Sequence, residues 1–134
     1  MQAETNSEEA LLQSFESLTL DPARFGHREH LALAWSFLQR YGFPDGAARF
    51  IARLQAYVEH VGAAGKYHET VTWAYLVLLN EERVLRSSPD ESFQSVLARR
   101  PDLLDHRKGA IARLYSEEQL ASAGARRVFE LPRP

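Results

Sequence analysis

The stretch Leu31-Ala32-Leu33-Ala34-Trp35-Ser36-Phe37-Leu38 decides the fold, because it is apolar at nearly every position. It lies inside a segment that starts near His27 and stops at Gly42-Phe43-Pro44-Asp45-Gly46, which is a cluster of helix breakers. A helix that is apolar almost all the way round is buried on all sides. The stretch therefore predicts a central helix over residues 27–41.

Three more segments have the apolar spacing of helices. Asn6 or Ser7 can cap a first helix, which should end before Asp21-Pro22. Residues 47–60 have a plain amphipathic stripe and predict a half-exposed helix. Residues 67–85 are apolar nearly all round from Val71 to Leu79 and predict a second central helix.

The last third of the chain has shorter signals. Ser88-Pro89-Asp90-Glu91 and Ser116-Glu117-Glu118-Gln119 have the pattern of capping boxes, which predicts a short helix after each. Pro101 must end or restart the first of these helices. Residues 127–134 lack a helical period and predict an extended tail, docked through Phe129 and Leu131.

Length and pattern together predict an all-α protein. The 134 residues suit one domain with one core, and no period-2 alternation is long enough for a sheet. We expect a compact single-domain helical bundle over residues 1–134, with about four main helices, short C-terminal helices and an extended tail. Residues 1–6 and 130–134 are the ends expected to be flexible.

Composition and charge exclude several function classes. Sixteen Lys and Arg against eighteen Asp and Glu give a net charge of −2, with both signs scattered along the sequence. The sequence therefore lacks the basic stripe that is typical of a nucleic-acid-binding protein. Without cysteine, the chain has no disulfide, thiolate metal site or Cys nucleophile. The polar N-terminus is no signal peptide, and no apolar run reaches the ~18 residues of a membrane span. We expect a cytoplasmic protein without nucleic-acid or membrane partners.

The histidines are expected to converge. Short loops make consecutive helices antiparallel neighbours, so the starts of helices 27–41 and 67–85 should share one end of the bundle with the end of helix 47–60. His27, His30, His60 and His68 occupy these positions. His27 and His30 are three residues apart and lie on one helix face. We therefore expect the side chains of His27, His30 and His68 within about 8 Å of one another, as ligands of one ion.

Three neutral imidazoles suit a divalent transition metal, namely zinc, copper, iron, nickel or manganese. Glu69 or Glu59 can add a carboxylate or orient an imidazole. The main hypothesis is a metal-dependent enzyme that acts on a small molecule, with His27, His30 and His68 as metal ligands. Glu69 and Tyr67 are then the catalytic candidates for handling a proton or orienting the substrate. The pattern does not separate redox from hydrolytic chemistry.

Two alternatives stay open. In the first, the protein is a metal-free module in which two helix N-termini, with Lys66 and the histidines, bind a carboxylate or phosphate. In the second, the protein has a structural or partner-docking role. The histidines then have local structural tasks: His27 caps a helix, and His30 and His68 each hydrogen-bond a buried carbonyl.

Two stretches carry a resemblance to a known family. Phe25-Gly26-His27-Arg28-Glu29-His30-Leu31 and Lys66-Tyr67-His68-Glu69-Thr70-Val71-Thr72, with Tyr115-Ser116 and Ala125-Arg126 later, resemble the motifs of a small bacterial family of uncharacterised helical proteins. The likeness covers about residues 24–132. It implies a helical fold and no particular activity.

Overall fold

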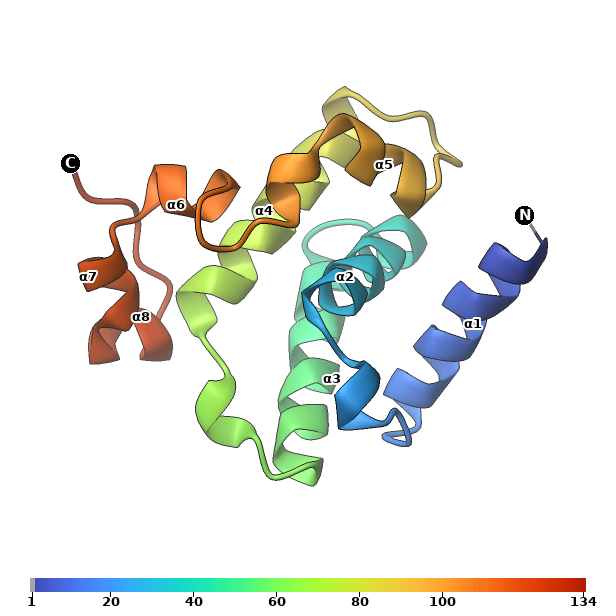
Figure 1. Ribbon diagram of the computed structural model, residues 1–134, viewed down its shortest axis with the longest axis horizontal. Coiled ribbons are helices and arrows are strands. Elements are labelled where there is room, and N and C mark those ends of the chain that lie inside the picture. Colours follow the sequence, from blue (N-terminus) through green and yellow to red (C-terminus); the bar gives the residue numbers. More distant parts are fainter. Residues whose placement is uncertain (1) are drawn as a thin grey trace. The chain divides into compact units, whose positions relative to one another are not determined.

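The computed structural model describes residues 2–134, with side chains from Glu8 onward, and its regular structure is helical (Figure 1). The predicted all-α class is therefore confirmed for these residues. The chain divides into two compact units, residues 1–66 and 67–134. No helix in the described part of the chain is long and apolar enough to cross a membrane.

The first unit contains three long helices. They are α1 (Gln2–Glu16), α2 (His27–Tyr41) and α3 (Asp45–His60), with the short 3-10 helices η1 (Pro22–Arg24) and η2 (Ala64–Lys66). The predicted helix 27–41 matches α2. Gly42 ends α2 at a φ of 74°, a backbone conformation that favours glycine. At Gly46 an added Cβ would lie 2.5 Å from the carbonyl oxygen of Phe37, so glycine lets α3 begin close against α2.

An aromatic cluster forms the core of the first unit. The fully buried ring of Phe15 lies 5.9 Å from Phe50, 5.7 Å from Tyr57 and 6.2 Å from Phe37, measured between centroids. The Tyr57 hydroxyl donates to the carbonyl oxygen of Leu20 at 2.9 Å. Because these rings come from α1, α2 and α3, the cluster joins all three helices. Aromatic pairs of this kind add about 0.5–1.5 kcal/mol each beyond the area they bury.

The second unit contains one long helix and four short ones. They are α4 (Glu69–Leu85), α5 (Phe93–Arg99), α6 (Ala110–Leu114), α7 (Glu117–Ala121) and α8 (Ala123–Arg127), with the 3-10 helix η3 (Pro101–Leu103). Ser116 caps α7 as predicted, accepting from the amide of Gln119. The predicted helix toward residue 124 is interrupted, since Ser122 caps a separate helix, α8.

The capping box predicted at Ser88 is wrong. Ser92 caps α5, and Ser88 belongs to a turn in which its carbonyl accepts from the amide of Glu91 at 3.1 Å. The physical reason is the carboxylate of Glu91. It is bound by the guanidinium of Arg99, so it does not reach back to cap a helix at Ser88.

The tail after α8 is extended and docked within the second unit, as predicted. Thr70 and Tyr115 hydrogen-bond its main chain at Val128 and Glu130. The predicted cause is wrong, however, because the side chains of Phe129 and Leu131 are 41% and 73% exposed. The tail is therefore held by hydrogen bonds to its main chain and not by burial of its apolar side chains.

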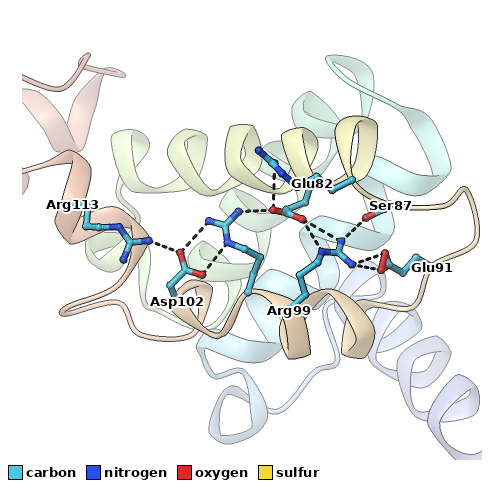
Figure 2. Close-up of polar contacts among 8 residues, drawn as sticks. Glu82, Ser87, Glu91, Arg99, Asp102 and Arg113 are labelled. Atoms are coloured by element: carbon cyan, nitrogen blue, oxygen red, sulfur yellow. Dashed lines mark hydrogen bonds and ion pairs between the residues drawn. The ribbon is translucent and has the colours of Figure 1, made fainter.

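A buried carboxylate ties the helices of the second unit together (Figure 2). The side chain of Glu82 on α4 is fully buried, and one of its oxygens lies 3.1 Å from Nη2 of Arg99 at the end of α5. Arg100 and Arg86 bind its other oxygen. Burying an ionised carboxylate is costly unless it is paired in this way. The position of α5 on α4 therefore follows from Glu82.

The network continues from Arg100 to the short helices. Arg100 binds both oxygens of Asp102 in η3, and Arg113 of α6 lies 2.6 Å from the same carboxylate. The hydrogen bonds from Arg100 hold the pKa of Asp102 below its usual range, against the opposing effect of burial. Asp102 thus connects η3 with α6 through Arg100 and Arg113.

Replacing Glu82 by Gln should lower the free energy of unfolding by about 3 kcal/mol, because the guanidinium groups around it lose their charge partner. Urea unfolding followed by circular dichroism measures this loss. The exposed neighbour Glu81 is the matched control, and Glu81→Gln should change stability by less than about 0.5 kcal/mol. Equal stabilities for the two variants would show that the Glu82 network does not hold the unit together.

Candidate functional site

His68 is held at both ring nitrogens. It is the N-cap of α4, where Nδ1 accepts from the amide of Val71 at 3.2 Å. Its Nε2 lies 2.7 Å from the carbonyl oxygen of Leu120. A carbonyl only accepts, so Nε2 carries the proton and the ring is neutral. A metal ion could bind His68 only by displacing one of these partners, and the geometry favours the structural hypothesis for this residue.

Tyr67 and Glu69, the two catalytic candidates, contact each other. The Tyr67 hydroxyl donates to Oε1 of Glu69 at 2.5 Å, and both side chains are half-buried. They flank His68 at the start of α4. Thr72, one turn further, donates its hydroxyl to the carbonyl of His68 at 2.7 Å. The start of α4 is thus a local hydrogen-bonded group, and its tyrosine–carboxylate pair is the part with acid–base character.

His27 and His30 lie in the first turn of α2, in the first unit. The helix begins after Gly26, whose amide donates to the carboxylate of Glu29 at 3.0 Å, so Glu29 is used as a cap. The half-buried imidazole of His30 stacks on Phe25 with centroids 5.6 Å apart and planes 11° apart. The His30 ring also contacts Phe50, with the two ring centroids 5.4 Å apart. His30 is therefore part of the aromatic core.

The aromatic surroundings control the protonation of His30. Burial, and to a smaller extent the nearby charge of His27, together lower the pKa of His30 to about 4. The ring is consequently neutral at physiological pH. A neutral imidazole is the form that binds metals, but it is also the form that packs best among aromatic rings.

The predicted metal ligands are divided between the units: His27 and His30 belong to the first and His68 to the second. In the part of the chain that the structure describes, no group of three or more His, Asp or Glu side chains is placed to hold a metal ion. Glu59 and His60, the additional candidates, are exposed at the end of α3. The metal site of His27, His30 and His68, and the enzyme built on it, remain predictions.

The first unit has a pocket that the sequence did not point to. It has a volume of about 360 Å³ and lies between α1, η1 and the start of α2. Its lining residues are Glu8, Ala10, Leu11, Ser14, Leu20, Arg24, Arg28 and Glu29. The sequence signal that could have indicated it is the pair Arg24 and Arg28, which flank Phe25-Gly26-His27.

The two sides of this pocket differ in chemistry. Leu11 and Leu20 give it an apolar part, while the exposed side chains of Arg24 and Arg28 bring two positive charges beside the N-terminus of α2. A helix N-terminus favours negative charge. Glu29 already caps the helix, and Glu8 from α1 adds a second carboxylate to the lining. The arrangement suits a small molecule with an anionic group and an apolar part.

Comparisons with protein-family models, with curated proteins and with solved structures found no match to this chain. The resemblance to a bacterial helical family therefore stays a prediction, and the function must be argued from the residues.

Lowering the pH should destabilise the first unit through His30. The folded chain keeps this ring neutral down to about pH 4, whereas the unfolded chain binds a proton near pH 6.5, so stability falls as the pH drops between these values. The loss is on the order of 2–3 kcal/mol by pH 4. An NMR titration of the His30 ring should give a midpoint below about pH 5.

A His30→Phe variant isolates this effect. It should lose less stability than the parent chain between about pH 7 and pH 4.5 in urea unfolding, whereas His106→Gln, at an exposed position, should follow the parent. An NMR midpoint near the ordinary histidine value would contradict the burial of His30.

Replacing His68 by Ala should destabilise the second unit by about 1–3 kcal/mol, because α4 loses its cap and Leu120 loses its donor. His68→Asn should recover part of this, since Asn is also a good N-cap. The loss should be the same with and without a metal chelator in thermal melts. If the chelator alone lowers the parent's stability as much as the substitution does, His68 is a metal ligand instead.

Proposed function

We propose that the first unit is a binding module for a small organic anion, a carboxylate or phosphate, which it holds in the pocket between α1 and the start of α2. The observation that carries this proposal is the presence of Arg24 and Arg28 on one pocket that also contains Leu11 and Leu20. An anionic group can meet the arginines while an apolar part lies against the leucines. This is the metal-free alternative derived from the sequence, placed on different basic residues.

Arg24 is the residue on which the proposal depends most. Its guanidinium has no hydrogen-bond or ion-pair partner among the described residues, although the nearby acids of the pocket include Glu29. An arginine without a partner keeps all five of its N–H donors for a ligand. Carboxylate and phosphate are the groups that this planar fork binds in a bidentate manner.

The helix start adds a second favourable effect. Arg28 is in the first turn of α2, where the aligned peptide dipoles give a partial positive charge. Glu29 offsets part of it, because its carboxylate caps Gly26. The pocket volume of about 360 Å³ is at the small end of the range for ligand sites, which favours a metabolite-sized molecule.

Arg24→Ala should weaken the binding of a short-chain carboxylate, with hexanoate as the probe, by about tenfold or more, because one charge-assisted hydrogen bond of roughly 1.5–3 kcal/mol is lost. Arg28→Ala should have a similar effect. Isothermal titration calorimetry measures hexanoate binding by both variants. Inorganic phosphate serves as a second probe, an anion without an apolar part.

Arg40→Ala is the matched control, because Arg40 is an exposed arginine at the other end of α2 and does not line the pocket. It should bind hexanoate like the parent chain. If the parent binds neither probe at millimolar concentration, or if all three variants bind alike, the pocket is not an anion site.

A further inference from the structure

The tail of the second unit is held by the side chain of Thr70 in an unusual way. The Thr70 hydroxyl donates to the carbonyl oxygen of Val128 at 2.9 Å and accepts from the amide of Glu130 at 3.1 Å. The Thr70 hydroxyl thus makes the two main-chain hydrogen bonds that a neighbouring strand would make to an extended segment in a sheet. Thr70 is fully buried, so the tail is the partner that satisfies this hydroxyl.

Gln119 repeats this pattern three residues further along the tail. Its Nε2 donates to the carbonyl oxygen of Leu131 at 3.0 Å, and its Oε1 accepts from the amide of Arg133 at 3.3 Å. The same Nε2 lies 3.1 Å from the carboxylate of Glu130. Between the contacts of Thr70 and those of Gln119, the Tyr115 hydroxyl donates to the carbonyl oxygen of Glu130 at 2.7 Å. Gln119 and Tyr115 are both buried.

The side chains of the tail contrast with its main chain. Val128, Phe129 and Leu131 are 57%, 41% and 73% exposed, so the apolar groups of the tail add little to the core. The contacts go to main-chain groups and to one carboxylate, that of Glu130. Peptide ligands bound in an extended form are recognised in this way, through the main chain and a few selected side chains.

We infer that Thr70, Tyr115 and Gln119 form a peptide-binding groove that the chain's own tail fills, and that an extended segment of a partner protein can replace the tail there. The chemistry of the segment follows from the present occupant: a glutamate between two apolar residues. Main-chain hydrogen bonds are the same for any extended segment, so exchanging one for another costs little.

The test uses the full chain and a fluorescent peptide with the sequence of residues 126–134. In the parent chain the tail competes from within the molecule at a high effective concentration, so the peptide should bind weakly. Glu130→Lys removes the hydrogen bond between Gln119 and the carboxylate of the tail and should increase peptide affinity by about tenfold or more in fluorescence anisotropy. Glu130→Gln is the milder variant to use if Glu130→Lys does not fold by circular dichroism.

Two controls locate the binding in the groove. Adding Gln119→Ala to the Glu130 variant should abolish the gain, and a peptide with lysine in place of its glutamate should bind more weakly. If the folded Glu130 variants bind the peptide no better than the parent, or if Gln119→Ala has no effect, the inference is overturned. It is also overturned in favour of tail exchange between copies if light scattering shows that the Glu130 variants form dimers without peptide.

Discussion

The buried charge of Glu82 is the constraint on which the second unit depends. A carboxylate removed from water needs charged partners at hydrogen-bonding distance, and Arg99 and Arg100 supply them from the end of α5. Because the two arginines are adjacent in sequence, α5 must end where both can reach α4. The same Arg100 then fixes Asp102, and through it η3 and α6. One electrostatic requirement thus determines where several short helices lie, none of which is long enough to be stable alone.

The first unit is organised by a different interaction. Its helices meet in an aromatic cluster around Phe15, which needs no charge and tolerates His30 as one more ring. The shift in the His30 pKa is a consequence of that packing. The polar chemistry of this unit lies outside the cluster, at the pocket where Arg24 and Arg28 meet α1. Core and candidate site meet at Leu20, which lines the pocket and whose carbonyl oxygen accepts from Tyr57 of the cluster.

Local signals in the sequence were enough for the helices and for several caps. The apolar stretch around Trp35 predicted α2 with its observed bounds, and Ser116 predicted the start of α7. The prediction that Ser88 starts a helix was wrong, because Glu91, the acid of the expected capping box, binds an arginine eight residues further on. Glu82 could not be found either: it stands beside Glu81 in a charged run, and only the position of α5 makes one of the two buried.

The candidate sites show the same limit. Spacing placed His27 and His30 on one helix turn, but it could not show that His30 packs between Phe25 and Phe50. For His68, the acceptor at Leu120 is 52 residues away, so no local pattern reveals that both ring nitrogens are engaged. The division into two units is equally invisible in chain length, because 134 residues suit one domain with one core. The division also gives each unit one of the two tryptophans, with Trp35 buried in the first and Trp73 half-buried in the second. The chain thus carries a separate intrinsic fluorophore in each half, and the Trp35→Phe and Trp73→Phe chains report the unfolding of one unit at a time.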